Sequence, residues 1–117
     1  EIKTEATVNR QEFLNAVKLT KVFAGRANDV GIRVGENKKS LEVYSADSAL
    51  GENLYKIPIK LKGEKFSLTF NWHYLLDGLK IYTSEDIILG VNESTKPIII
   101  KSPTESKLRY VVMPIKS

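Results

Sequence analysis

The chain contains the same strand-to-helix junction twice, and this repeat restricts the fold more than any other feature. The segment TVNRQEFLNAVK at 7–18 recurs as TFNWHYLLDGLK at 69–80. The matched positions are Thr7, Asn9, Leu14 and Lys18 in the first copy and Thr69, Asn71, Leu76 and Lys80 in the second. Each asparagine follows an alternating segment and can accept a hydrogen bond from a first-turn N–H, as a helix N-cap does. The sequence therefore predicts two copies of one structural unit.

The first copy reads as a strand, a helix and three further strands. The strand spans 5–8, and apolar residues at helical spacing predict a helix from Arg10 to Ala24. The side predicted to be buried carries Phe13, Ala16, Val17, Thr20 and Ala24, and the opposite side carries Gln11, Asn15 and Lys18. Segments 29–35, 40–47 and 52–59 alternate as strands do, and the turn-rich stretches GENKKS and SALG separate them.

The second copy repeats this order from Lys65. A strand at 65–70 leads into a helix expected from Trp72 to Tyr82. Its predicted buried side carries Trp72, Leu75, Leu76 and Leu79, and its outer side carries His73, Asp77 and Lys80. Segments 86–91, 96–102 and 107–115 read as strands, with NESTK at 92–96 as a hairpin loop.

Two copies of β-α-β-β-β predict one α+β domain over 1–117, with halves 1–62 and 63–117. We expect the halves to pack about a pseudo-twofold axis, because neither copy alone covers the apolar face of its own sheet. Shared local rules for strands, caps and amphipathic helices could also produce such a match by coincidence. The three strands that follow each helix favour the repeat.

Composition excludes several classes of catalytic site. The chain has no cysteine and a single histidine, so a disulfide framework and thiolate catalysis are absent, and a zinc site would depend on His73 and carboxylates. No nucleophile motif, glycine-rich phosphate loop or metal-binding spacing occurs, and we expect no cofactor and no metal. His73 and Asp77 stand one helical turn apart, which leaves a small hydrolase or lyase as an alternative. A solvated surface pair is the favoured interpretation, in a non-catalytic scaffold or binding domain.

The charge and hydropathy patterns suggest a soluble protein with weak attraction for anions. The formal net charge is +4, and the lysines are spread along the whole chain, so any contact with nucleic acid should be loose. No apolar run approaches the roughly 20 residues of a membrane span. The missing cysteines fit a reducing compartment, and we expect the cytoplasm. Because the chain starts with Glu1 rather than Met, we expect it to be part of a longer protein.

Three segments carry a resemblance to a known family. EATVNRQEFLNAV near the start, FNWHYLLDGLK in the middle and YVVMPIK at the end resemble, in this order, the C-terminal domain of the bacterial DNA polymerase III beta subunit, the sliding clamp. The resemblance covers nearly all of 1–117. It implies a processivity-clamp fold, with two helices on one face and antiparallel sheets outside. A generic twofold-repeat interaction domain without a role in replication remains the other reading.

The resemblance also implies an assembly and a set of partners. Family members are dimers of three-domain chains whose six domains close a ring around duplex DNA, so this chain would be the third domain of a homodimeric ring. Isolated, it would be a monomer. The polar sides of both helices would face the hole and contact DNA without sequence preference, through Gln11, Asn15, Lys18 and Lys80. The region after the first helix, near Val22 and Phe23, would meet the neighbouring subunit.

A peptide-binding groove is the last feature that the resemblance implies. In the family this groove docks short motifs of the polymerase, the clamp loader and repair proteins. The positions carried over are Asn71, Tyr74, Thr95, Pro97, Val111, Val112, Met113, Pro114, Ile115 and Lys116. A deformable methionine, branched valines and a tyrosine suit varied apolar anchors. Val112 and Tyr110 could equally be core residues of the last strand, with only its other face lining the groove.

Overall fold

The structure is a computed structural model that describes residues 3–24, 28–45, 54–92, 96–105 and 107–115. Some predicted features lie outside these described residues. They are Thr95, Lys116, the SALG turn at 48–51 and most of the NESTK loop.

Each half contains four strands and one α-helix in the same order. The first half comprises β1 (Thr4–Asn9), α1 (Arg10–Thr20), a 3-10 turn η1 (Lys21–Phe23), β2 (Asp29–Val34), β3 (Ser40–Ser45) and β4 (Leu54–Lys62). The second half comprises β5 (Ser67–Asn71), α2 (Trp72–Lys80), β6 (Asp86–Val91), β7 (Ile98–Lys101) and β8 (Arg109–Val112). None of the helices in the described residues is long and apolar enough to cross a membrane.

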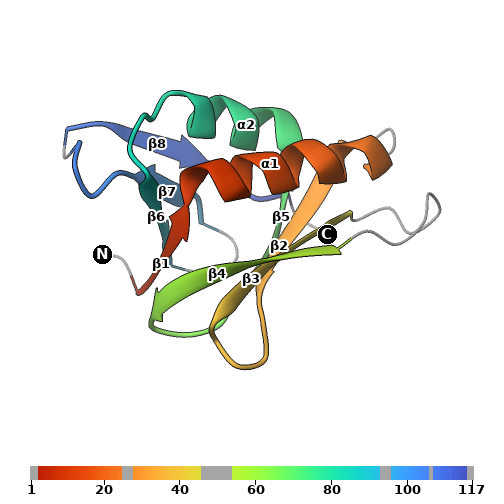
Figure 1. Ribbon diagram of the computed structural model, residues 1–117, viewed down its shortest axis with the longest axis horizontal. Helices are drawn as coiled ribbons and strands as arrows, with labels where there is room; N and C mark the ends of the chain where they lie inside the picture. The colour runs from red at the N-terminus through yellow and green to blue at the C-terminus, as the bar shows by residue number, and fades with distance from the viewer. Residues whose placement is uncertain (1–2, 25–27, 46–53, 93–95, 106, 116–117) are drawn as a thin grey trace.

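The strands form one antiparallel sheet in the order β5-β2-β3-β4-β1-β6-β7-β8. Figure 1 shows α1 and α2 side by side on one face of these strands, running in opposite directions. Exchanging β1–β4 with β5–β8 returns the same neighbour relations except one, since β4 pairs with β1 whereas no strand pairing joins β8 to β5 in the described residues, so the two halves share one topology. The predicted α+β fold, with two helices on one face of antiparallel strands and an internal repeat, is confirmed.

The two junctions are built by equivalent contacts. Asn9 and Asn71 each cap their helix, and each Oδ1 accepts a first-turn N–H at 2.9 Å. The N–H of Arg10 donates to the Glu85 oxygen at 2.9 Å. Likewise, the N–H of Trp72 donates to the Asn28 oxygen at 3.0 Å. Each helix is thus attached at its first residue to the opposite half.

The halves differ where their last strands return to their first strands. β4 pairs with β1 over Glu5–Val8, opposite Lys62–Ile59. In the described residues, the counterpart contact between the chain after β8 and β5 is one backbone bond, from the Ile115 N–H to the Thr69 oxygen at 2.7 Å. The motif IPIK at 57–60 recurs as MPIK at 113–116, but Lys60 lies opposite Thr7 whereas Ile115 lies beside Thr69. The chain after β8 therefore meets β5 one residue out of the register that β4 keeps with β1.

Both helices bury the sides that their sequences predict, with one correction. Phe13, Ala16, Val17, Thr20 and Ala24 are buried, as are Leu75, Leu76 and Leu79. Trp72, expected to be buried, is only partly so. It begins α2 at the end of the helix pair, where Lys21 Nζ lies 4.6 Å from its ring centroid and the His73 ring stacks on it at 3.6 Å.

Both predicted helix ends were wrong by a few residues. α1 ends at Thr20 because the chain tightens into η1, where the Ala24 N–H donates to the Lys21 oxygen at 3.1 Å. α2 ends at Lys80, and the fully buried Tyr82 beyond it turns into the core.

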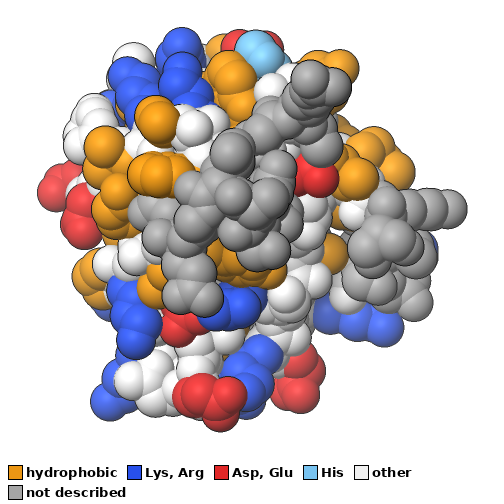
Figure 2. Space-filling view, turned by 90° about the vertical axis from the view of Figure 1, so that its right-hand side faces the viewer, with side chains coloured by type: hydrophobic (Ala, Val, Ile, Leu, Met, Phe, Trp, Pro, Cys, Tyr) orange, Lys and Arg blue, Asp and Glu red, His pale blue; other side chains and the backbone are white. Residues whose placement is uncertain are grey.

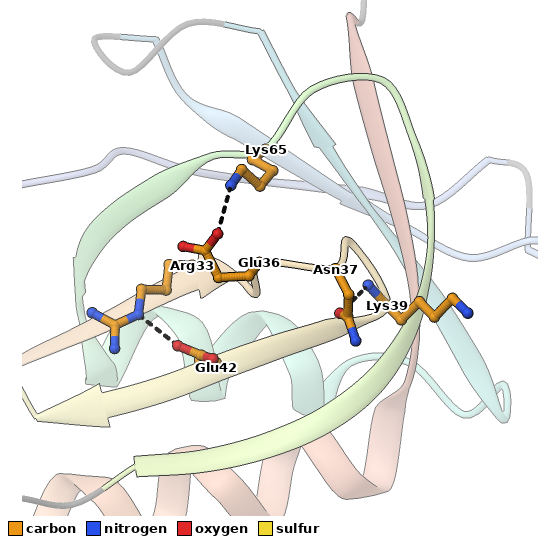
Figure 3. A network of polar contacts seen from close by, with 6 residues as sticks. All are labelled: Arg33, Glu36, Asn37, Lys39, Glu42 and Lys65. Carbon is orange, nitrogen blue, oxygen red and sulfur yellow. Dashed lines mark hydrogen bonds and ion pairs between the residues drawn. The ribbon is translucent and has the colours of Figure 1, made fainter.

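The outward face of the sheet around β2 and β3 carries a polar network (Figure 3). Arg33 Nε lies 2.7 Å from Glu42 Oε1, and Lys65 Nζ lies 3.9 Å from Glu36 Oε2. The Arg33 guanidinium also lies 4.4 Å from the centroid of the Tyr44 ring. That ring covers Gly31, where a Cβ atom would come within 2.3 Å of it. On this face of the sheet, the side chains of Arg33, Glu42 and Tyr44 contact one another and cover the backbone at Gly31.

Tyr82 connects the end of α2 to the last two strands. Its hydroxyl hydrogen-bonds to the carbonyl oxygen of Ile100 and lies 3.2 Å from that of Leu108. Burial raises the pKa of Tyr82 from its ordinary value, and the charge of Glu105 adds to the rise. The protonated hydroxyl is the form that these carbonyl oxygens need.

Gly78 lets the ring of Tyr110 lie directly against α2. A Cβ atom at Gly78 would come within 2.4 Å of Tyr110 Cδ2, far inside normal contact. Glycine is costly inside a helix, so its presence here is explained by the space that the ring occupies.

We expect Tyr82→Phe to lower the free energy of unfolding by about 1–3 kcal/mol, because two buried carbonyl oxygens lose their donor. The raised pKa favours the folded state fully below the unfolded value of 10.0, and this contribution is lost as pH rises through the folded pKa. Urea unfolding at pH 8 and at pH values above 10 measures both effects. Tyr55→Phe, a partly buried tyrosine on β4, is the control and should change little; equal losses in the two variants would contradict the role of Tyr82.

We expect Gly78→Ala to destabilise the fold by about 1–3 kcal/mol despite the better helix propensity of alanine, because the Tyr110 ring must move. Thermal unfolding measures the loss, and the proton shifts of Tyr110 report the displacement. Lys80→Ala, at an exposed position of the same helix, should stay within about 0.5 kcal/mol of the parent. A Gly78→Ala variant at least as stable as the parent would contradict this packing.

Candidate functional site

A shallow pocket forms where α2 meets β8. It is lined by Tyr74, Tyr110, Val111, Val112 and Met113, and its volume is about 240 Å³. We call it the tail pocket. Helix α2 supplies Tyr74 from its first turn, and β8 with the residue after it supplies the rest. The fold thus brings together two segments about forty residues apart that sequence analysis had assigned to one groove.

The side chains of the tail pocket alternate in exposure along the strand. Val111 and Met113 are each 57% exposed and Tyr74 is 58% exposed, whereas Val112 is 2% exposed and belongs to the core. Exposed apolar side chains that gather in one place mark interaction surfaces more often than isolated ones do. The tail pocket therefore offers a branched chain, a flexible thioether and an aromatic ring to a ligand.

Other predicted groove residues lie beside the tail pocket without lining it. Asn71 caps α2 with its side chain, and Ile115 is held against β5 by its bond to Thr69. Pro97, just before β7, and Pro114 are partly buried.

Tyr110 lines the tail pocket, although the sequence suggested it only as an alternative core residue of the last strand. Its ring is partly buried against Gly78 and forms part of the pocket lining. Burial raises the pKa of Tyr110, and the nearby Asp77 and Tyr74 raise it further. The sequence signal for the contact between Tyr110 and α2 was Gly78, a glycine in the middle of a predicted helix.

The outer sides of the two helices form a mainly polar surface. Gln11, Asn15, Lys18 and Lys80 are all exposed, and Gln11 Nε2 donates to Asn15 Oδ1 at 3.0 Å. The junction repeat matches His73, Asp77 and Lys80 with Gln11, Asn15 and Lys18. Figure 2 shows lysine and arginine side chains at the upper, helical edge of one side of the molecule and also along its lower edge. Asp77 adds one acid to this surface.

The His73 and Asp77 pair shows no built catalytic arrangement. Both side chains are exposed, and no hydrogen bond or ion pair joins them in the described part of the chain. The His73 ring is stacked on Trp72 instead. Across the described ranges, no group of three or more histidine, cysteine or acidic residues could hold a metal ion.

The end of α1 exposes apolar side chains. Val22 is 72% exposed and Leu19 is 51% exposed. Phe23 is partly buried, and its carbonyl oxygen accepts a bond from Ser45 Oγ at 2.6 Å. Of the two predicted interface residues, Val22 is thus the one most open to a partner.

The sequence matches a family model described as the DNA polymerase III beta subunit, C-terminal domain, over residues 1–116. Among relatives, it is 30% identical over 120 residues to the beta sliding clamp of Synechococcus elongatus and 27% identical over 118 residues to that of Bacillus subtilis. These matches cover 99% and 98% of this chain but 31% of each relative.

Solved structures agree with these sequence matches. The beta subunit of DNA polymerase III from Thermotoga maritima superposes with a TM-score of 0.91 at 27% identity, over 99% of this chain and 31% of that one. The DNA polymerase sliding clamp from Bacillus subtilis superposes with a TM-score of 0.92 at 27% identity, over 100% of this chain and 31% of that one. The chain belongs to the family of C-terminal domains of the DNA polymerase III beta subunit.

Proposed function

We propose that this chain is one segment of a sliding-clamp ring, a non-catalytic processivity factor that tethers the replicative polymerase to duplex DNA. Within that ring it docks short peptide motifs in the tail pocket and guides DNA along its two helices. The observation that carries the proposal is the tail pocket, because its apolar side chains come from the two segments that resemble the family's peptide groove.

The chemistry of the tail pocket suits a short extended peptide with apolar anchors. Met113 adapts its shape to different side chains, and the Tyr74 ring combines an apolar body with a polar hydroxyl. Asn71, Pro97, Pro114 and Ile115 extend the proposed groove, as do Thr95 and Lys116, which lie outside the described residues. A pocket of about 240 Å³ holds only one or two anchors, so a second domain is needed to complete the groove.

The helical surface suits DNA that must move. Lys18 and Lys80 supply two ammonium groups, and Gln11 and Asn15 supply amides that can reach phosphate oxygens. Few charges make a weak, salt-dependent and sequence-independent attraction, which does not obstruct sliding. In a closed ring the topology retains the DNA, so strong attraction at any one position is unnecessary.

The length of the relatives supports an assembly from several domains. Because this chain spans 31% of the relatives that it matches, we propose that it is the third domain of a three-domain subunit and that two subunits form the ring. Val22, with Phe23 beside it, would meet the neighbouring subunit. One small apolar patch buries too little area for a stable dimer, so the isolated domain should be a monomer. We propose the cytoplasm as its location.

We expect a peptide with the clamp-binding pattern, glutamine followed by apolar residues, to shift the amide signals of Tyr74, Val111, Val112, Met113 and Ile115. Met113→Ala should weaken this binding by about 5- to 30-fold, the loss expected for truncating an anchor contact. Val22→Ala, another exposed apolar position, is the control and should bind as the parent does. Shifts confined to other surfaces would reject the tail pocket as the docking site.

We expect the domain to bind duplex DNA weakly, with affinity that falls as salt rises. Replacing both Lys18 and Lys80 with glutamine should reduce the slope of log affinity against log salt by about 1 for each lysine. The matched control replaces Lys38 and Lys39, two exposed lysines in the β2–β3 turn, and should leave the slope unchanged. A larger effect of the control pair would place the DNA elsewhere.

A further inference from the structure

A second pocket lies at the other junction, where α1 begins. Its lining is Thr7, Asn9, Glu12, Pro58, Ile59, Lys60 and Asp86, and its volume is about 310 Å³. We call it the α1 pocket. It is larger than the tail pocket, and the paired strands β1, β4 and β6 supply most of its lining.

The internal repeat relates the α1 pocket to the proposed peptide groove. Asn9 and Glu12 are the junction counterparts of Asn71 and Tyr74. Pro58, Ile59 and Lys60 occupy the same places in IPIK as Pro114, Ile115 and Lys116 occupy in MPIK. Asp86 faces Asn9 across the sheet, as Asp29 faces Asn71. The duplicated unit thus forms a concave surface at both of its junctions.

The chemistry of the two pockets differs at one decisive position. The tail pocket has the Tyr74 ring where the α1 pocket has the Glu12 carboxylate. Asp86 adds a second carboxylate, and Lys60 is the one basic side chain in the lining. Acidic groups thus outnumber basic groups here, although the whole chain carries a formal charge of +4. Arg10 lies outside the lining and donates its Nε–H to the Ser84 oxygen at 2.9 Å.

The two carboxylates are available to a ligand. Both Glu12 and Asp86 are exposed, and neither forms an ion pair with any residue that the structure describes. The side-chain contact of Asn9 goes to the backbone N–H of Glu12 and leaves the carboxylate unengaged. Pro58 and Ile59 provide an apolar wall beside them.

We propose that the α1 pocket binds a short extended peptide in which an arginine or lysine stands next to an apolar residue. The cationic side chain pairs with Glu12 and Asp86, and the apolar neighbour packs on Pro58 and Ile59. This site is separate from the tail pocket in position and differs from it in charge, since the lining of the tail pocket contains no carboxylate and no basic side chain. The inference goes beyond the proposed function and does not require that motif peptides bind the tail pocket.

The test uses the 117-residue chain and two capped dipeptides, acetyl-leucyl-arginine amide and acetyl-leucyl-citrulline amide. Citrulline has nearly the shape of arginine and no charge. The arginine peptide should shift the amide signals of Asn9, Glu12, Ile59 and Asp86, and it should bind about three- to tenfold more tightly than the citrulline peptide. The difference should shrink as salt is raised, because exposed ion pairs are screened.

Variants assign the effect to the two carboxylates. Glu12→Gln combined with Asp86→Asn should bind both peptides equally, whereas Glu36→Gln, which removes an exposed acid from the β2–β3 turn, should behave as the parent. Three results would overturn the proposal: no shifts at the α1 pocket, equal affinity of the parent for both peptides, or shifts restricted to Tyr74, Val111 and Met113. The spectrum of each variant without peptide confirms that it is folded.

Discussion

The fold depends on the exchange of contacts between halves at the two junctions. β1 pairs with β6 of the second half, and β5 pairs with β2 of the first. The first N–H of each helix donates to a carbonyl oxygen of the other half, Arg10 to Glu85 and Trp72 to Asn28. Because one edge of each leading strand and the first N–H of each helix find their partners across the pseudo-twofold axis, neither half satisfies all of its backbone hydrogen bonds alone.

This exchange fixes where the functional surfaces lie. Both helices leave their junctions on the same side of the sheet, so their buried sides meet one core and their polar sides share one outer surface (Figure 1). The same junctions place the start of each helix beside the strand that closes its half. One geometry, used twice, thus produces the outer helical surface that we propose faces DNA and two pockets whose side chains differ.

Sequence reasoning succeeded where local rules decide the structure. Asparagine caps and helical spacing located both helices, and alternation located the strands, because these signals act over a few residues. It failed where distant segments meet. The half-exposed Trp72 depends on Lys21 from the other half, and the lining role of Tyr110 depends on Gly78 of α2. The α1 pocket was missed because the recurrence of IPIK as MPIK indicates a second pocket only when β4 is known to pair with β1.

The last strand of each half is attached unequally to the first strand of that half. Four residue pairs join β4 to β1, whereas in the described residues one backbone bond, from Ile115, joins the chain after β8 to β5. Local opening costs least where few backbone bonds and few buried contacts must break. Opening between β5 and the chain after β8 should therefore cost less free energy than opening between β1 and β4. The tail pocket lies beside this less paired contact, whereas the α1 pocket lies where β1 and β4 pair over four residues.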